Sequence, residues 1–390
     1  MAWREQSPMD SRVHFISDYL DGRFTIVDLC QEHGISRRIG YKWIHRYEAE
    51  GLRGLEDRLR TPRRCPHKTP DEIVKLILAF RKQHPTWGPK KLLDRLGRRD
   101  PGLPWPAEST CADILSRHGL TRGKRRRRRI GHPGPPRTQI TAPNQVWTAD
   151  FKGQFKMRDG LYCYPLTVAD ACSRYLLGCQ ALLSTSLAGS RPVFLRLFKE
   201  YGLPQRIRTD NGTPFAAVAL GRLSQLSAWW LRLGIYPELI EPGKPQQNGR
   251  HERMHRTLKN EATRPPSGNR NAQQRRFNRF RDEFNNERPH EALGQETPAS
   301  CYTASTRKMP DRLEPFEYPD HFETRFVGSN GGIRWKSKYI PVSYSCTGEN
   351  IGLEEIDHGV WTVYFGPLKL GRLLEKDMRI EDTTGNLRRR

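Results

Sequence analysis

The sequence lacks several features that mark common classes of protein. Its eight cysteines form no CxxC pair, which excludes a zinc ribbon and a dithiol redox motif. No apolar run approaches the roughly 18 residues that a membrane-spanning helix needs, and the N-terminal MAWREQSPMDSR holds no apolar signal segment. No GxxxxGK[ST] loop is present, so ATP use is not expected. We therefore expect a cytoplasmic protein that does not enter a membrane.

Acidic residues are scarce relative to basic ones. The chain carries 67 Lys and Arg against 43 Asp and Glu, a formal net charge of +24 over 390 residues. A basic surplus is a poor means of gaining solubility, whereas Lys and Arg that neutralise phosphates release condensed counterions. The charge therefore predicts a nucleic-acid partner. A chain of this length has room for about two to four modest domains.

Capping residues divide the first segment, residues 1–60, into three short helices. Thr25 can cap the second helix with Asp28 as its capping-box partner, and Gly34 ends that helix. Ser36 can cap a third helix that runs to about residue 50. This spacing is typical of a helix-turn-helix, although a plain helical hairpin fits it equally well.

The third of these helices supplies candidate DNA contacts. Ile39, Trp43 and Tyr47 can face the helical core because they follow a helical period. The opposite face then carries three exposed basic residues that could read a DNA groove, namely Arg37, Arg38 and Lys42. The alternative is that they are ordinary solvated side chains.

A second helical unit is expected over residues 65–121. Thr69 to Glu72 form a predicted capping box with Pro at the first helical position. Two further helices are expected to begin near Pro89 and Ser109. The unit is therefore a candidate second helix-turn-helix that binds DNA.

A strongly basic segment follows the helical units. Seven of the eight residues from Arg122 to Arg129 are basic, and Gly and Pro dominate the residues behind them. A nuclear-localisation signal fits this composition but explains nothing downstream. We interpret residues 122–142 as an interdomain linker whose cations contact DNA phosphates, namely Lys124, Arg125, Arg126, Arg127, Arg128 and Arg129.

From about residue 143 the pattern changes from the helical period to strand-like runs. Five runs, VWTADFKG, LYCYPLTVADA, RYLLGCQAL, QRIRTDNG and GIYPELI, are separated by turns and helices. The helices are expected over 187–201, 220–233 and 248–262, with a basic one over 271–286. This order predicts an α/β domain over residues 143–305 with a mixed five-stranded sheet.

The C-terminal part is predicted to be all-β. Six short strands with SNGG, DHG and GP turns predict a small β-barrel over residues 320–378, which would contact DNA or another subunit. Residues 379–390 are expected to form a basic tail. The predicted fold class is thus multidomain, with all-α units, a central α/β core and a small β-barrel.

Three acidic residues of the α/β region stand where they could share a cleft. Asp150 lies inside the first strand, and Asp210 ends the fourth strand directly before Asn211-Gly212. If these strands are neighbours, both carboxylates project side by side from the sheet. Glu252 stands near the start of the following helix, which can pack across that end of the sheet and complete the group.

Such a cluster suits divalent metal ions. Mg²⁺ prefers carboxylate oxygens, and two ions roughly 3.5–4 Å apart can assist both the attacking and the leaving oxygen in phosphodiester cleavage. Each acid alone has a simpler explanation, since an Asp after a strand often caps a turn and a Glu in the first turn of a helix complements its dipole. The combination favours a metal site.

Residues 143–300 resemble the catalytic core of DDE-type insertion-sequence transposases, relatives of retroviral integrases with a ribonuclease-H-like fold. The resemblance is carried by NQVWTADFKG, TVADACSRY, IRTDNGTPFA, PGKPQQNGRHERMHRTLK and NNERPHEALGQETPASCY, which occur in the family's order. It implies that Asp150, Asp210 and Glu252 are a catalytic triad that binds two Mg²⁺ or Mn²⁺ ions. It also implies that the N-terminal helices bind the element's terminal repeats.

The resemblance implies a DNA transposase, which is a polynucleotidyl transferase. Such an enzyme hydrolyses a phosphodiester to free a 3′-OH and joins that hydroxyl to target DNA. Its partners would be terminal inverted repeats, target DNA and further copies of the chain assembled on DNA, at a bacterial nucleoid. Further DNA contacts are expected near the acids or on the face that Glu252 shares with neighbours on its helix, namely at Asn211, Lys244, Asn248, His255 and Lys259.

One spacing departs from the family's pattern. Between Asp210 and Glu252 lie 41 residues, more than in many related transposases and integrases. The extra length falls around GRLSQLSAWWLRLG, which we expect to form one longer helix. Glu238 and Glu241 are closer to Asp210 but fall in a Pro-flanked strand end, so Glu252 is preferred. The His/Cys zinc module of retroviral integrases is also missing.

Two rival functions remain. The first is a DNA-binding regulator or an inactive transposase derivative that occupies repeats without catalysis. The second is a zinc metalloprotease, because His251-Glu252-Arg253-Met254-His255 matches HExxH, with Glu283 or Glu287 as a third ligand. The crowded positive charge on that helix opposes Zn²⁺, and the zinc hypothesis leaves Asp150 and Asp210 unexplained.

Overall fold

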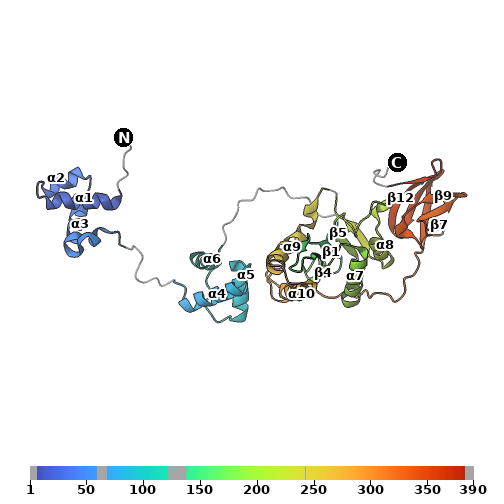
Figure 1. The fold of residues 1–390 in the computed structure, drawn as a ribbon, viewed down its shortest axis with the longest axis horizontal. Helices are drawn as coiled ribbons and strands as arrows, with labels where there is room; N and C mark the ends of the chain where they lie inside the picture. Colours follow the sequence, from blue (N-terminus) through green and yellow to red (C-terminus); the bar gives the residue numbers. More distant parts are fainter. Residues whose placement is uncertain (1–6, 59–67, 122–137, 242, 383–390) are drawn as a thin grey trace. The chain divides into compact units, whose positions relative to one another are not determined.

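The computed structural model of the chain describes residues 7–58, 68–121, 138–241 and 243–382 (Figure 1). It divides into two compact units, Met1–Thr69 and Pro70–Arg390, and each is described by itself. The predicted linker contacts, Lys124 and Arg125 to Arg129, lie outside the described residues and stay predictions. Within the described ranges, no helix is both long and apolar enough to cross a lipid bilayer.

The first unit consists of three helices and a short turn. These are α1 (Pro8–Leu20), α2 (Ile26–Glu32), α3 (Arg37–Glu50) and the 3₁₀ turn η1 (Gly51–Leu55). The predicted N-caps form, because the Thr25 hydroxyl accepts the Asp28 N–H and the Ser36 hydroxyl accepts the Ile39 N–H. The reciprocal half of the predicted Thr25–Asp28 capping box does not form, since the Asp28 carboxylate accepts the Thr25 hydroxyl instead. Gly51 ends α3 with φ 63°, a conformation that favours glycine.

Helix α3 carries the predicted groove-reading residues on its exposed side. Trp43 and Gly40 are buried, but Ile39 is 42% exposed, so the expectation that Ile39 faces the core is wrong. Gly40 takes the inward position because a Cβ there would lie 2.5 Å from the Cys30 Sγ and 3.1 Å from Phe15. The three predicted DNA contacts are all exposed: Arg37, Arg38 and Lys42.

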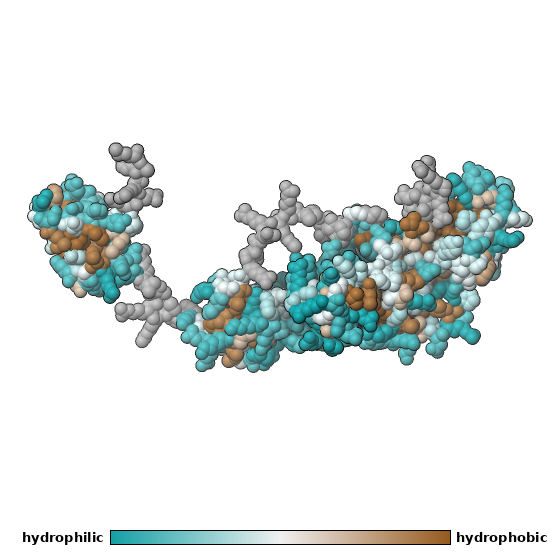
Figure 2. Space-filling view, in the orientation of Figure 1, coloured by the Kyte–Doolittle hydropathy of each residue, from teal (hydrophilic) through white to brown (hydrophobic). Residues whose placement is uncertain are grey.

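This unit also exposes apolar side chains. Figure 2 shows brown, hydrophobic surface on it between hydrophilic regions. Its exposed large apolar residues include Leu20, Phe24, Val27 and Leu52. The unit therefore presents both basic and apolar surface.

Three more helices begin the second unit. These are α4 (Asp71–Gln83), α5 (Pro89–Arg99) and α6 (Glu108–Arg117). They share a core in which Ile77, Trp87 and Leu92 are fully buried. The predicted capping box at Thr69 is wrong, because Pro70 is the N-cap residue and no side chain caps the helix there.

The predicted α/β region contains a mixed sheet with helices on both sides (Figure 1). Its strands are β1 (Val146–Phe151), β2 (Phe155–Lys156), β3 (Tyr162–Asp170), β4 (Leu176–Leu182), β5 (Arg206–Thr209) and β6 (Tyr236–Leu239). The five predicted strands lie in the order β4-β3-β1-β5-β6, with β1, β5 and β6 parallel. The two-residue β2, which was not predicted, pairs with the start of β3.

Side chains of β1 alternate between the two faces of this sheet. Trp147 and Ala149 pack with α7 (Leu187–Tyr201) and α8 (Gln225–Arg232) on one face. The other face packs against α9 (Gly249–Ala262) and α10 (Arg270–Asn286), and there Thr148 and Asp150 contact histidines of α9. The strand period therefore directs Asp150 toward the helix that carries Glu252.

The segment between β5 and β6 differs from the single helix expected over residues 220–233. A 3₁₀ turn, η2 (Leu220–Arg222), precedes the shorter α8. The helix is interrupted because Gly221 takes φ 59° and Ser224 starts α8 in a reciprocal cap with Ser227. The remaining short turns are η3 (Pro245–Asn248), η4 (Glu291–Leu293), η5 (Pro298–Cys301) and η6 (Tyr344–Cys346).

The C-terminal part is all-β, as predicted. Its strands are β7 (Glu323–Phe326), β8 (Gly332–Trp335), β9 (Lys338–Pro341), β10 (Asn350–Asp357), β11 (Val360–Phe365), β12 (Leu368–Leu374) and β13 (Arg379–Asp382). The expected barrel is not confirmed, because the strands form an antiparallel sheet in the order β13-β12-β11-β10-β7 and a separate β8-β9 hairpin. Residues 379–382, expected to begin the basic tail, belong to this sheet, and 383–390 lie outside the described residues.

The C-terminal sheet shares one core with η2 and α8. Leu220 and Leu223 are buried together with apolar residues of β10, β11 and β12. The Ser345 hydroxyl donates to the Leu223 carbonyl at 3.0 Å, and the Gly221 N–H donates to Asp382 Oδ1 at 3.2 Å. The residues that lengthen the interval between the second and third acids therefore hold the C-terminal sheet.

Candidate active site

Asp150 and Asp210 lie at corresponding positions of two neighbouring parallel strands. Thr148 of β1 pairs with Arg208 of β5, and two residues further along each strand come Asp150 and Asp210. The prediction that their strands are neighbours is confirmed. Asp210 directly follows β5, and its Oδ1 accepts the Gly212 N–H at 3.2 Å, so the chain turns there.

Glu252 reaches the same region from α9. It lies in the first turn of that helix and is exposed, whereas His251 and His255 on either side are buried against the sheet. Its negative charge acts on Asp150, as does that of Asp210. The structure thus brings the three predicted acids into one electrostatic neighbourhood.

The pKa of Asp150 reflects its burial and the charges of the neighbouring acids. It rises from the usual 3.8 to about 7, first because the carboxyl is buried and then because Asp210 is negatively charged, with a smaller contribution from Glu252. Mutually repelling carboxylates favour a bound divalent cation, which offsets their charge, and carboxylate oxygens are the donors that Mg²⁺ prefers. Asp150, Asp210 and Glu252 supply donors of this kind, and among the described residues Asp150 also lies within 4.8 Å of ligand nitrogens of His251 and His255.

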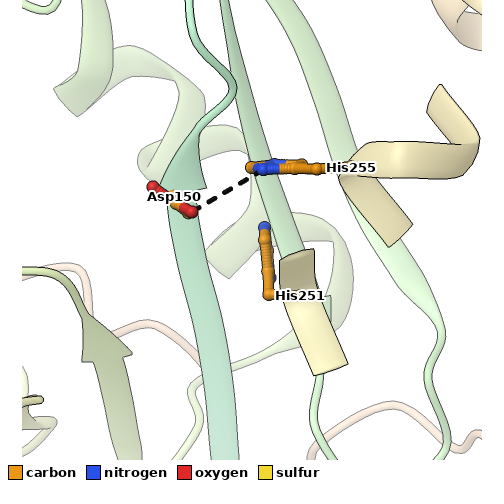
Figure 3. A group of neighbouring side chains, drawn as sticks. All are labelled: Asp150, His251 and His255. Atoms are coloured by element: carbon orange, nitrogen blue, oxygen red, sulfur yellow. Dashed lines mark ion pairs between the residues drawn. The ribbon is translucent and has the colours of Figure 1, made fainter. Parts of the chain in front are cut away.

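Two histidines of α9, His251 and His255, lie beside Asp150 (Figure 3). The Thr167 Oγ1 lies 2.7 Å from Nε2 of both histidines. His251 Nδ1 lies 2.8 Å from the Thr148 Oγ1, and His255 Nδ1 lies 3.6 Å from Asp150 Oδ2. Five side chains from β1, β3 and α9 therefore form one buried polar group.

The hydroxyl of Thr167 is a partner shared by both rings. It can donate to the Asp150 backbone carbonyl at 3.1 Å, and its oxygen can accept from both Nε2 atoms. Burial lowers the pKa of His251 to about 3 and that of His255 to about 2, which keeps both rings neutral. His255 Nδ1 faces the Asp150 carboxyl at 3.6 Å.

The arrangement does not favour the HExxH alternative. The group that could hold a metal around the two histidines has Asp150 as its third member within the described residues. Glu283, one of the third ligands considered from sequence, instead pairs with His84 at 3.1 Å. Both ring nitrogens of His251 are hydrogen-bonded to threonine hydroxyls, which leaves none free for zinc.

The predicted DNA contacts near the acids differ in how exposed they are. Lys259 is exposed, and the exposed Lys244 pairs with Glu241 at 2.7 Å. Asn211 and Asn248 each have a buried Oδ1 with no hydrogen-bond partner among the residues that the structure describes. His255 is 6% exposed and faces Asp150, so its expected direct contact with DNA is not supported.

Sequence reasoning missed Thr148, Thr167 and Lys152 as members of the site. The two threonines are polar positions inside otherwise apolar strands, which is a signal that a partner side chain satisfies them. Lys152 follows Asp150 by two residues, and its pKa is lowered by burial and then by Lys259. Its charge opposes the rise of the Asp150 pKa, so it lies close to the carboxyl.

The sequence matches families that agree with this arrangement. Residues 140–245 and 233–298 each match a family described as an integrase core domain. Together these two matches span residues 140–298. Residues 11–64 match a helix-turn-helix domain and residues 39–115 a homeodomain-like domain. These matches confirm the resemblance to DDE-type insertion-sequence transposases and the N-terminal helix-turn-helix units.

Curated relatives of the integrase core domain include insertion-element proteins and retroviral polyproteins. A 31.7 kDa protein of insertion element IS407 from Burkholderia multivorans is 28% identical over 45% of this chain and 61% of its own length. A 39.2 kDa protein of IS476 from Xanthomonas euvesicatoria is 28% identical over 49% of this chain and 55% of its own. The Gag-Pol polyprotein of avian reticuloendotheliosis virus is 31% identical over 32% of this chain but only 10% of its own.

Solved structures with a similar core include retroviral integrases. The HTLV-2 integrase catalytic core domain in complex with magnesium matches at a TM-score of 0.34 and 16% identity, over 42% of this chain and all of that one. The simian T-cell lymphotropic virus intasome with a PP2A regulatory subunit matches at 0.37 and 14%, over 75% of this chain and 97% of that one. The family assignment rests on the sequence matches.

Proposed function

We propose that this chain is a DNA transposase that frees a 3′-OH at the ends of its element and joins it to target DNA. The observation that supports the proposal is that Asp150, in a region matching an integrase core domain, is raised in pKa to about 7 by burial and by the charges of Asp210 and Glu252. Carboxylates kept together despite their repulsion are typical of a metal-dependent site. The excess of positive charge suits the polyanionic substrate.

The three acids would hold two Mg²⁺ or Mn²⁺ ions as catalytic residues. Bound divalent cations supply Lewis-acid stabilisation of the charge that develops on phosphodiester oxygens. β1 and β5 fix two of the carboxylates, and the Thr167–His255 contact orients the Asp150 side chain from behind. Rigid placement of this kind is what phosphoryl transfer requires of the protein.

The reaction proceeds in two balanced steps. In the first, water attacks the phosphodiester at the element end, one P–O bond forms as another breaks, and the leaving 3′ oxygen takes a proton. In the second, the free 3′-OH attacks a phosphodiester of target DNA, loses its proton and displaces a target 3′ oxygen. Bond number is conserved in the transesterification, so it needs no external energy source.

DNA recognition is assigned to the basic side chains outside the acid cluster. Arg37, Arg38 and Lys42 of the helix-turn-helix would read the terminal repeats, and the linker residues Lys124 and Arg125 to Arg129 would contact phosphates. Asn211, Lys244, Asn248 and Lys259 would position the strand near the acids. We propose that several copies assemble on DNA, because two element ends and a target must be held at once, and that the protein works at the bacterial nucleoid.

The test replaces each acid by its amide in the full-length chain. Asp150→Asn, Asp210→Asn and Glu252→Gln should each reduce nicking and strand transfer of labelled terminal-repeat duplexes in Mg²⁺ to the level without protein. A gel-shift assay should show unchanged end binding. Asp282→Asn, which alters a carboxylate 64% exposed on α10, is the matched control and should remain active.

The outcomes separate the rival functions. Shifted DNA without any nicked product from the unaltered chain would support a binding protein or an inactive derivative. Strand transfer retained by one amide variant would remove that residue from the triad. Casein cleavage restored by Zn²⁺ after chelation would support the protease.

A further inference from the structure

A second charged cavity lies beside α9, and none of the three acids lines it. Its volume is about 520 Å³, and it is bordered by the start of α9, the turn between β3 and β4, and the segment that follows α10. The basic side chains that line it come from four segments of the chain: Lys91, Arg174, Arg250, Arg253, Arg256 and Arg288.

The cavity has far more positive than negative charge. Asp170 and Glu291 are its lining carboxylates. The Asp170 carboxylate already accepts hydrogen bonds from the backbone N–H groups of Asn144, Cys172 and Ser173, so its oxygens are occupied at the β3–β4 turn. The Glu291 carboxylate is exposed and lies 3.4 Å from the amine of Lys90, a residue that does not line the cavity. Of the lining cations, Arg288 pairs with Glu261 at 2.7 Å, and Glu261 and Glu291 act more weakly on Lys91.

Three of the cations lack partners altogether. In the part of the chain that the structure describes, the side chains of Lys91, Arg253 and Arg256 make no hydrogen bond or ion pair. Lys91 is partly buried, whereas Arg253 and Arg256 are exposed. Burial and then the charge of Arg288 lower the pKa of Lys91 to about 8, against the opposing charges of Glu261 and Glu291. A partly buried cation such as Lys91 is costly unless an anion joins it.

Two arginines are held in place at the cavity by a shared acceptor. The Ala171 carbonyl accepts from Arg174 Nη1 at 2.9 Å and from Arg250 Nη1 at 3.3 Å. Arg174 takes φ 66°, the left-handed region that residues other than glycine rarely adopt. Such strain is found where a side chain must be aimed at a function. The two guanidinium groups are thus positioned together before any ligand binds.

A further polar atom at the cavity is unsatisfied. His290 lines it, and its buried Nε2 has no hydrogen-bond partner within the described residues. Burial and then Lys91 lower the pKa of His290 to about 3, so the ring is neutral, and its one N–H is used in a hydrogen bond to the Phe284 backbone. The lone pair of Nε2 therefore needs a donor such as water, whereas an anion in the cavity would supply the acceptor that the three unpaired cations lack.

We propose that this cavity binds a phosphate group of the DNA backbone. Guanidinium groups match phosphate oxygens in a two-pronged geometry, and Arg250, Arg253 and Thr257 share the α9 face adjacent to Glu252. A DNA strand anchored here would be fixed relative to the acid on the same helix. The source of the phosphate rests on the proposed transposase function, whereas the anion site itself does not.

The first experiment measures DNA affinity against salt concentration for the full-length chain. The double variant Arg174→Gln/Arg250→Gln should weaken binding and reduce the slope of log K against log salt by about 1, the value for one lost phosphate contact. Arg196→Gln, which removes an exposed arginine of α7 on the opposite face of the sheet, should leave the slope unchanged. An unchanged slope in the double variant would overturn the proposal.

A second variant distinguishes the loss of an anion site from the misfolding of the chain. Lys91→Met removes an unpaired, partly buried cation, so it should raise Tm while weakening DNA binding. Inorganic phosphate, compared with chloride at equal ionic strength, should raise the Tm of the unaltered chain by roughly 2–4 °C near ten times its dissociation constant. It should have no such effect on the double variant. Equal effects of phosphate on both proteins would contradict an anion site in the cavity.

The two proposals fail differently. If the chain cleaves no DNA but the phosphate-dependent Tm shift depends on Arg174 and Arg250, the cavity is supported and the transposase function is wrong. If the chain cleaves and joins DNA while both cavity variants bind it with the original slope, the cavity proposal alone is wrong.

Discussion

Asp150 illustrates a cost that a site residue imposes on the fold. Its pKa of about 7 lies above its usual 3.8, so the folded chain binds an extra proton between these pH values and loses stability as pH rises through them. The penalty is absent near pH 4 and complete above about pH 7. An uncharged side chain of the same shape does not cause this loss of stability.

We therefore expect Asp150→Asn to stabilise the metal-free chain while it abolishes activity. Tm should rise by roughly 2–4 °C for each kcal/mol recovered, with the gain largest at pH 8 and lost near pH 4. Mg²⁺ should raise the Tm of the unaltered chain and narrow the gap. A gain that is equal at pH 4 and pH 8, measured by thermal unfolding with EDTA, would contradict the assignment of cause.

Thr167 is expected to matter because one hydroxyl serves three partners. Thr167→Val keeps the shape of the side chain but leaves His251 Nε2 and His255 Nε2 without their acceptor. Unsatisfied buried polar groups cost about 1–3 kcal/mol each, so urea unfolding should show a loss of this order. Thr167→Ser should restore most of the stability and the strand-transfer rate. A serine variant as impaired as the valine variant would argue against the hydroxyl.

At the scale of elements, the strands were predictable and their connections were not. The alternation in Val146–Phe151 predicted a strand with Asp150 on one face, and the capping residues placed α3 correctly. η2 and α8 were predicted as one helix because Leu220 to Leu233 is apolar enough for a helix throughout. Half of that apolar surface is buried against the C-terminal sheet, a tertiary contact that no local pattern reports.

Leu223 tests whether this connection holds the C-terminal sheet. It is 1% exposed, and Leu223→Ala should destabilise the chain by about 2–5 kcal/mol. Hydrogen exchange should accelerate in β10 to β12 more than in β1, because the lost contacts face the C-terminal sheet. Leu183→Ala, at a position 48% exposed, is the matched control and should change neither. Equal acceleration in β1 would show that the connection supports the core instead.

At the scale of the whole molecule, the placement of the two aspartates was predictable and the basic cavity was not. The prediction placed Asp150 beside Asp210 on the condition that strands one and four are neighbours, and the β1–β5 pairing meets that condition. Glu252 required the family resemblance, because 41 residues intervene. The cavity gathers Lys91, Arg174 and Arg288 from segments that become neighbours only in the folded chain. The spacing of these residues in the sequence does not indicate that they lie together in the folded chain.

The long interval between the second and third acids has a consequence for comparing related chains. Its additional residues bury Leu220 and Leu223 against the C-terminal sheet and do not line the acid cluster. The number of residues between Asp210 and Glu252 therefore depends on how the C-terminal sheet is attached. We expect it to vary without changing the arrangement of the acids. Insertion and sheet should be inherited together, and a relative that lacks this sheet should also lack the insertion.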